Sequence, residues 1–367
     1  MQAMETAISQ SKNNNYGVEN FDEHRFGKYN SPAKPNLSVW QKIKNLLKSA
    51  DNKSHNGTHI KSDIYKFIPN PEKFVRLYSA LQKKDQELLI SLLAYRYLGY
   101  QKIKLQRNTN QYWGLFEQAA SVENKNDTYD PHFLAFMLTK FDLNPIGKDI
   151  KLYYASMGIV ATFFVEQYAY KILDKNFIEV EKNDVVFDLG ACWGDTALYF
   201  ADKTENEGKV YSFEFIPGNL ELLNINLDLN PHLRSIIEVV EHPVSNKSND
   251  IIYYQDHGPS SKIFLHPFEK QTGSTTTISI DDFVKKKSIE KVDFIKMDIE
   301  GAEMQALHGA VETIRKFRPK LGIAIYHSLN DMVDIPNWIL DLDLGYEIFL
   351  DHFTTHAEET VCFAKPK

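Results

Sequence analysis

Short apolar runs alternate with helical patterns of apolar residues in the second half of the chain. The runs lie at 185–189, 210–213, 236–240, 292–297 and 321–326. Runs of this length, joined by segments with helical spacing, are typical of parallel strands that are buried on both faces. The pattern therefore predicts a doubly wound, Rossmann-like α/β sheet, which we place at residues 180–367.

The first half of the chain has a different pattern. Residues 63–179 carry apolar residues at helical spacing, for example Phe74 and Leu77, and predict a mostly helical accessory segment. Residues 1–62 are rich in Asn, Ser, Lys and Gly, and predict a flexible polar tail. Within this tail, residues 37–47 form an amphipathic pattern. That helix either packs on its own domain or docks on a partner or a membrane surface.

Composition restricts the partners and the compartment of the chain. Its 42 basic and 49 acidic residues give a net charge of -7, which provides no overall attraction to nucleic acid. The two cysteines, Cys192 and Cys362, lie far apart and support neither a disulfide framework nor a zinc site. The start of the chain lacks a signal-peptide pattern, and the longest apolar stretch, 157–165, is too short to span a membrane. We expect a cytoplasmic protein without a transmembrane segment or a nucleic-acid partner, and a homo-oligomer stays possible.

A glycine loop follows the first predicted strand of the sheet. Asp188 ends the strand, and Gly190, Ala191 and Gly194 lie in the loop before the next helix. Glycines allow the backbone to approach a ligand closely, and open α/β sheets bind ligands at the carboxyl ends of their strands. The loop lacks the G-x-G-x-x-G spacing of dinucleotide enzymes, so an oxidoreductase is the weaker interpretation. The glycines could also be ordinary turn residues.

An acidic residue, Glu214, ends the second predicted strand. It follows the loop by about twenty residues, the position at which a carboxylate binds the hydroxyls of a ribose. The strand, the loop and this acid together predict a nucleoside-binding site.

A charged cluster ends the predicted strand at 292–297. It contains Lys296, Asp298, Glu300 and Glu303. Lys296 and Asp298 lie on the same side of a strand, so a salt bridge between them is one expectation. The glutamates at the start of the next helix also have a purely structural explanation, since a helix dipole favours acids there.

Together these motifs resemble the FkbM family of methyltransferases. The resemblance covers about 165–367 and rests on Asp188-x-Gly-Ala-x-x-Gly194, Phe213-Glu214-x-x-Pro217-x-Asn219, the strand 277–282, Lys296-x-Asp298-x-Glu300-Gly301-x-Glu303 and the ending at 352–361. It implies a seven-stranded class I methyltransferase sheet and S-adenosylmethionine as the cofactor, bound by Asp188, Gly190, Ala191, Gly194 and Glu214. The chain departs from the family pattern at Cys192 and Trp193.

The resemblance further implies O-methylation, often of a sugar or a secondary metabolite. We expect transfer to a hydroxyl of a small-molecule or glycan acceptor, with a sugar of a polysaccharide or glycolipid pathway favoured. The alternatives are a dinucleotide-dependent oxidoreductase and a non-catalytic binding module in a glycan-assembly complex.

Methyl transfer to a hydroxyl needs an aligned acceptor and a base that takes its proton. His327 directly follows the fifth predicted strand and is our candidate base, although a histidine there can equally well bond a neighbour. Lys296 is a candidate for stabilising the alkoxide, and Asp298 or Glu300 for holding acceptor hydroxyls or a divalent cation. His352 is a candidate lining residue of the acceptor pocket.

Overall fold

The computed structural model describes residues 6, 67–68, 70–100, 102–134, 136–173 and 175–367. Its internal contacts divide the chain into two units, residues 1–108 with 355–357, and residues 109–354 with 358–367. The described part of the first unit contains the helices α5 (Pro71–Ala80) and α6 (Lys83–Leu98). Helix α5 buries Phe74 and Leu77, as their spacing predicts. The predicted tail lies, apart from Thr6, outside the described residues, as does the predicted helix at 37–47.

None of the helices in the described residues is long and apolar enough to cross a membrane. The domain boundaries that we place at 62 and 179 stay predictions.

Seven strands form the central sheet of the second unit, in the order β14-β15-β13-β12-β6-β7-β8. They are β6 (Val185–Leu189), β7 (Lys209–Phe213), β8 (Ile237–Val240), β12 (Phe294–Met297), β13 (Lys320–Ala324), β14 (Tyr346–His352) and β15 (Thr360–Pro366). The strands from β13 to β8 pair in parallel, whereas β15 is antiparallel to both of its neighbours. This confirms the predicted α/β sheet. The strand order reverses between β6 and β12, and open sheets bind ligands at such a point.

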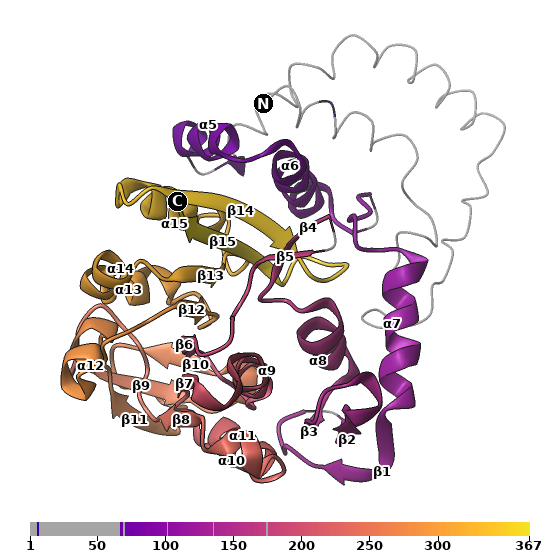
Figure 1. Ribbon diagram of the computed structural model, residues 1–367. Coiled ribbons are helices and arrows are strands. Elements are labelled where there is room, and N and C mark those ends of the chain that lie inside the picture. Colours follow the sequence, from indigo (N-terminus) through magenta and orange to yellow (C-terminus); the bar gives the residue numbers. More distant parts are fainter. Residues whose placement is uncertain (1–5, 7–66, 69, 101, 135, 174) are drawn as a thin grey trace, which may run out of the picture. The chain divides into compact units, whose positions relative to one another are not determined.

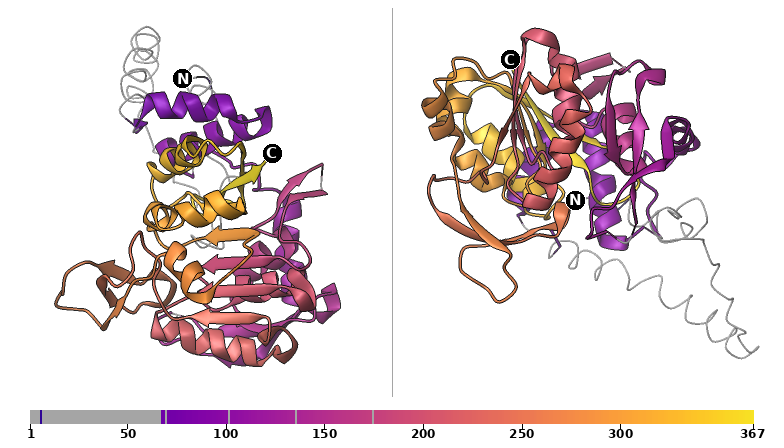
Figure 2. Two further views of the ribbon diagram at one scale, coloured as in Figure 1. Left: turned by 60° about the vertical axis from the view of Figure 1, so that its left-hand side comes forward. Right: turned by 90° about the horizontal axis from the view of Figure 1, so that it is seen from below.

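Helices cover both faces of this sheet (Figures 1 and 2). On β6, Phe187 packs against Phe283 of α12 (Ile280–Lys287), whereas Asp188 accepts a hydrogen bond from Thr196 of α9 (Asp195–Thr204). Neighbouring side chains of a strand point to opposite faces, so α9 and α12 lie on opposite sides. The other helices of this region are α10 (Pro217–Asp228), α11 (Pro231–Arg234), α13 (Glu303–His308), α14 (Val311–Phe317) and α15 (Asp331–Asp341), with the 3-10 turn η4 (Glu205–Glu207).

A small antiparallel sheet precedes the central one. It follows α7 (Asn110–Ser121) and consists of β1 (Glu123–Tyr129), β2 (Leu138–Asp142) and β3 (Lys151–Tyr154), with the 3-10 turn η2 (Asn144–Ile146). Two asparagines, Asn226 of α10 and Asn230 directly before α11, bond the backbone amides and carbonyls of Tyr153 and Lys151 on the edge strand β3. These side chains take the place of a further strand and fix β3 against the central domain.

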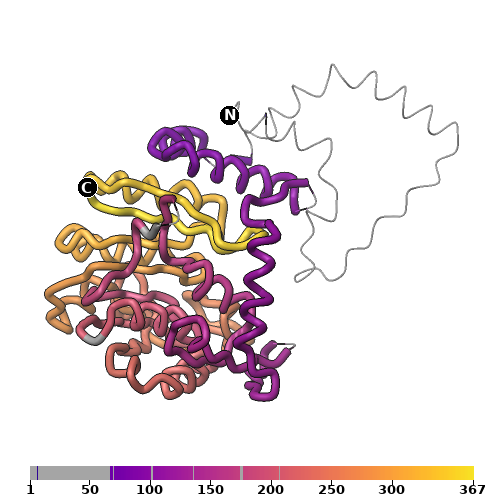
Figure 3. Tube along the Cα trace, turned by 45° about the vertical axis from the view of Figure 1, so that its right-hand side comes forward, coloured from indigo at the N-terminus to yellow at the C-terminus, as the bar shows by residue number. Residues whose placement is uncertain are grey.

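A π-helix connects the small sheet to the central domain. The short α8 (Ser156–Ile159) continues into this helix, η3 (Val160–Val165), and the hairpin of β4 (Tyr170–Ile172) and β5 (Lys175–Ile178) follows. Tyr170 of this hairpin packs against Phe349 of β14, with ring centroids 5.0 Å apart, and the path of the chain can be followed in Figure 3. Single π-helical turns often occur at functional sites.

A further small sheet is formed by the part of the chain between β8 and α12. Its strands are β9 (Ile251–Gln255), β10 (Lys262–Phe264) and β11 (Gly273–Thr276), in the order β10-β9-β11, and the 3-10 turn η5 (Gly258–Ser260) lies between β9 and β10. The residues around η5 reach the carboxyl ends of the central strands, where they line the cavity described below.

Replacing Asn226 by alanine should destabilise the protein by about 3 kcal/mol, because buried backbone groups of Tyr153 and Trp193 lose their partners. Urea unfolding measures this change in the free energy of unfolding. The control is Asn224→Ala on the same helix, whose amide bonds one carbonyl of its own helix, and its change should stay within about 0.5 kcal/mol. Equal effects of the two substitutions would contradict the role of Asn226.

Candidate active site

A cavity of about 350 Å³ lies at the carboxyl ends of the central strands. Its lining comes from the loops after β6, β7, β8, β12 and β13, from the segment 154–168, from residues around η5, and from the turn before β15. Five of the sequence-predicted site residues line it: Gly190, Glu214, Lys296, Asp298 and Glu300. The other five, Asp188, Ala191, Gly194, His327 and His352, do not belong to the described lining.

The glycine loop is held tightly against two other strand ends. Gly190 and Gly194 have φ angles of 83° and 87°, which favour glycine. A Cβ on Gly190 would lie 1.9 Å from the carbonyl oxygen of Asp298. The amides of Gly190 and Ala191 both donate to the carbonyl of Phe213, at 3.0 Å. The loop therefore connects β6, β7 and β12 at the floor of the cavity.

Asp188 is buried beneath this loop and forms an ion pair with Lys296. The carboxylate lies 3.1 Å from Nζ of Lys296, and the hydroxyl of Thr196 donates to both of its oxygens at 3.0 Å. Lys296 also donates to the carbonyl of Gly190 at 2.5 Å. The salt bridge of Lys296 is therefore with Asp188 on the neighbouring strand, in register with it, and not with Asp298 as the strand period suggested.

Burial by itself would lower the pKa of Lys296, but Asp188 and Asp298 outweigh it and raise the pKa. Lys296 therefore carries its charge at neutral pH. It lies between the glycine loop and the acids that follow β12.

Glu214 is fixed at the end of β7 by the chain that follows it. Its carboxylate accepts hydrogen bonds from the amides of Phe215 and Ile216 at 2.6 and 2.8 Å, and from the side-chain amide of Asn219 at 3.1 Å. The indole of Trp193 in turn donates to Asn219 at 3.0 Å. Burial nevertheless raises the pKa of Glu214. A preorganised carboxylate beside apolar lining residues suits the hydroxyls and base of a nucleoside.

Asp298 lies where the chain leaves β12. The hydroxyls of Tyr168 and Tyr326 donate to its two oxygens at 3.0 and 2.9 Å. Burial raises its pKa, although the charges of Lys296 and His327 oppose the shift. Asp298 is therefore a constrained hydrogen-bond acceptor at the far side of Lys296.

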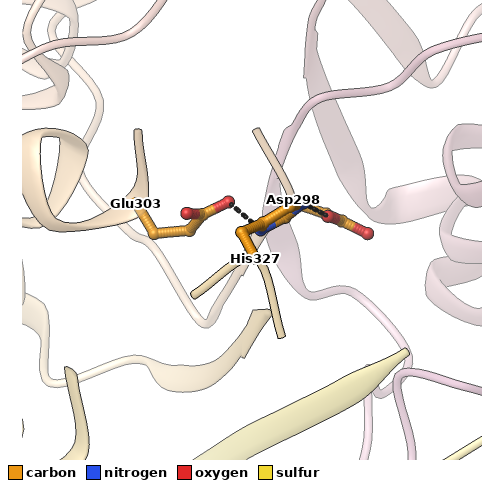
Figure 4. Close-up of side chains that lie close together, drawn as sticks. All are labelled: Asp298, Glu303 and His327. Atoms are coloured by element: carbon orange, nitrogen blue, oxygen red, sulfur yellow. Dashed lines mark ion pairs between the residues drawn. The ribbon is translucent and has the colours of Figure 1, made fainter. Parts of the chain in front are cut away.

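His327 lies behind Asp298 among three carboxylates. Its Nε2 is 3.5 Å from Asp298 and its Nδ1 is 3.3 Å from Glu303, and Figure 4 shows these three side chains. Its Nε2 also lies 3.7 Å from Glu300. Burial alone would lower its pKa, but Glu303, Asp298 and Glu300 outweigh burial and raise the pKa to about 9. The ring is thus an imidazolium at neutral pH.

The same cluster has the spacing of a metal site within the part of the chain that the structure describes. Asp298, Glu303 and His327 each bring one ligand atom within 4.8 Å of the others. Glu303 already accepts from the amides of Ile299 and Gly301, and a metal would require a neutral imidazole. We therefore interpret the cluster as an imidazolium held by carboxylates.

The predicted acceptor-pocket residue His352 is the last residue of β14. It is 3% exposed, and its Nδ1 is 2.9 Å from the hydroxyl of Thr360 on β15. The structure thus places it between two strands.

The structure adds an acid that sequence reasoning missed, Glu359. It precedes β15, has a φ of 68°, and lines the cavity. Its carboxylate accepts a short hydrogen bond from the side-chain amide of Gln167. Burial, followed by the charge of Asp298, raises its pKa to about 8 against the effect of Gln167. Its place directly before the last strand was a usable signal, since the antiparallel pairing of β15 with β13 brings this turn to the ligand edge.

Comparisons with known proteins find similarity to methyltransferases. Residues 180–348 match the model of the methyltransferase FkbM domain. The hexuronic acid methyltransferase AglP of Haloferax volcanii is 26% identical over 171 residues, which cover 46% of this chain and 67% of that protein.

Two solved structures are also similar. The methyltransferase FkbM of Methylobacillus flagellatus KT has a TM-score of 0.49 and 21% identity; the match covers 83% of this chain and spans 60% of that one. The fibrillarin of Aeropyrum pernix, solved with natively bound S-adenosyl-L-methionine, has a TM-score of 0.35 and 16% identity over 62% of this chain and 89% of that one.

Replacing Glu303 by glutamine should lower the pKa of His327 from about 9 toward its ordinary 6.5, because Glu303 contributes most to raising it. NMR titration of the imidazole measures this shift. Glu300→Gln is the matched control and should cause a smaller fall, since Glu300 is more distant and 55% exposed. A wild-type pKa near 6.5 would contradict the charged cluster.

Proposed function

Since residues 180–348 match the model of the methyltransferase FkbM domain, we propose that the chain transfers a methyl group from S-adenosylmethionine to a sugar hydroxyl. The acceptor would belong to a polysaccharide or glycolipid pathway. One observation carries the choice of a hydroxyl. The cavity that contains the nucleoside acid, Glu214, also contains a largely buried carboxyl, Glu359, that can accept a proton.

The cofactor end of the cavity suits the parts of S-adenosylmethionine. Glu214 would accept hydrogen bonds from the two ribose hydroxyls, and Phe215 and Ile216 provide an apolar surface for the adenine. The backbone of the loop from Gly190 to Gly194 would approach the methionine part. The bound cofactor supplies an electrophilic methyl group on its sulfonium.

Asp188 would act through its neighbours. Its carboxylate fixes Lys296 and, through it, the carbonyl of Gly190, and it is itself shielded from the cavity. We therefore propose that Asp188 positions the loop and does not contact the ligand.

The opposite end of the cavity would align the acceptor and take its proton. Asp298 and Glu300 can accept hydrogen bonds from sugar hydroxyls, and Lys296 can stabilise negative charge as the acceptor oxygen loses its proton. Glu359 would receive this proton while the oxygen bonds to the methyl carbon and the bond between that carbon and the sulfur breaks. A base with a pKa near the working pH is efficient in such a step.

His327 receives a different role from the base that the sequence suggested. It carries a proton below a pKa of about 9 and is absent from the described lining. We propose that its charge positions Asp298 and Glu300. A divalent cation has no part in this proposal, because the imidazolium already supplies positive charge behind Asp298.

Replacing Glu214 by glutamine should weaken S-adenosylmethionine binding at least tenfold, since a ribose hydroxyl loses a charged acceptor. Isothermal titration calorimetry measures the Kd. The control is Asp228→Asn, a change at an exposed aspartate of α10, which should bind as the wild type does. A Glu214→Gln protein that is folded and binds S-adenosylmethionine with unchanged affinity would refute the assignment of Glu214 to the ribose.

The rate of methyl transfer should rise with pH through an apparent pKa of about 8, because Glu359 accepts a proton only when it is ionised. Glu359→Gln should lower kcat by about 10²- to 10⁴-fold and remove this dependence, with S-adenosylmethionine binding retained. Glu347→Gln, on the same C-terminal hairpin but outside the described lining, should keep the wild-type profile. An unchanged profile in Glu359→Gln would exclude Glu359 as the base.

Transfer of labelled methyl from S-adenosylmethionine to a panel of glycosides tests the proposed function itself. Formation of S-adenosylhomocysteine together with a methyl ether is the expected result. Binding of the cofactor without transfer to any hydroxyl would favour the alternative of a non-catalytic binding module.

A further inference from the structure

The charged groups that line the cavity are almost all acidic. Among the described lining residues there are five carboxyl groups, those of Asp195, Glu214, Asp298, Glu300 and Glu359. The same lining includes one lysine, Lys296, one histidine, His242, whose Nδ1 lies 3.0 Å from the carbonyl oxygen of Thr276, and no arginine. This imbalance restricts the charge of an acceptor that can bind beside these acids.

Three of these acids lie at the acceptor end, and we call Asp298, Glu300 and Glu359 the acid wall. Their neighbours connect them: Asp298 and Glu300 both lie within 4 Å of His327, and the charge of Asp298 acts on Glu359. Asp195 and Glu214 do not belong to the acid wall. Asp195 accepts a hydrogen bond from the hydroxyl of Thr162 at 2.7 Å, and Glu214 lies at the end of the cavity proposed for the ribose.

The positive charges near the acid wall are already balanced. Lys296 lies 3.1 Å from Asp188, and its ammonium also donates to Gly190. The imidazolium of His327 is held by Glu303 on its other side and is not part of the described lining. A carboxylate on the acceptor would therefore face carboxylates without an arginine or a free lysine in the described lining to bind it.

Hydroxyl and ammonium groups fit the same wall well. Asp298 and Glu300 only accept hydrogen bonds when they are ionised, and Glu359 does so above its pKa of about 8, so neighbouring sugar hydroxyls or an amino group can donate to the wall. The rings of Tyr168 and Tyr326 lie beside Asp298 and add apolar surface for a sugar ring.

We propose that the acceptor is a sugar without negative charge, either neutral or amino-substituted, and that the acid wall excludes uronic acids. This inference rests on the proposed function and narrows its substrate class. It separates this chain from its relative AglP, whose name describes a hexuronic acid methyltransferase.

Matched acceptors test the proposal. The wild-type protein is incubated with labelled S-adenosylmethionine and with p-nitrophenyl glycosides of the gluco, galacto and manno series, each as the neutral sugar, the 2-amino sugar and the uronic acid. We expect kcat/KM for the uronic acid to be at least tenfold below that of its neutral counterpart in every series that reacts. Alkali distinguishes the products, since it cleaves a methyl ester on a uronate and leaves a methyl ether intact.

A charge-reversal variant tests whether the acid wall causes the discrimination against uronic acids. Glu300→Lys should raise kcat/KM for the uronic acid relative to the neutral sugar at least tenfold, and its 55% exposed side chain makes the change compatible with folding. Glu300→Gln should give a smaller change in the same direction. Glu347→Lys, at an exposed position outside the described lining, should leave the ratio as in the wild type.

Failure of this inference can be distinguished from failure of the proposed function. Equal or better use of a uronic acid by the wild type, or a methyl ester as the main product, overturns this inference and leaves methyl transfer intact. The absence of transfer to all nine glycosides, with the cofactor bound, overturns the proposed function and the inference with it.

Discussion

The buried ion pair between Asp188 and Lys296 is the interaction on which the rest of the site depends. The two residues are in register on β6 and β12, where the strand order of the sheet reverses, and Lys296 also holds the carbonyl of the glycine loop. Removing one partner from such a pair typically costs about 3–5 kcal/mol, because the other charge stays buried without compensation. The pair therefore fixes the glycine loop and the end of β12 relative to each other.

The acids around this pair differ in whether a positively charged side chain compensates them. Glu303 compensates the imidazolium of His327, and Asp188 compensates Lys296. Glu359 has only an amide, Gln167, as its hydrogen-bond partner in the described contacts and faces the charge of Asp298, so its pKa rises into the range of a working base. The proposed exclusion of anionic acceptors rests on the same surplus of acids. The proposed chemistry and the proposed selectivity would therefore come from one arrangement of charges.

Much of the sheet and part of the site could be predicted from the sequence, because both depend on local patterns. Apolar runs such as 185–189 mark strands, and Glu214 follows its strand at a fixed position. The partner of Lys296 was missed, since Asp188 is distant in sequence and adjacent only through strand pairing. The protonation of His327 depends on three acids around it, and the role of Glu359 on a turn before the last strand. Pairing and burial of this kind leave no periodic signal.

A crystal structure of the protein with S-adenosylhomocysteine shows whether the cavity binds the methyl donor. We expect density in the cavity with the ribose hydroxyls within hydrogen-bond distance of Glu214, and with the sulfur directed toward Lys296 and the carboxyl of Glu359. Density at another surface, or a sulfur directed away from Glu359, would contradict the proposed site.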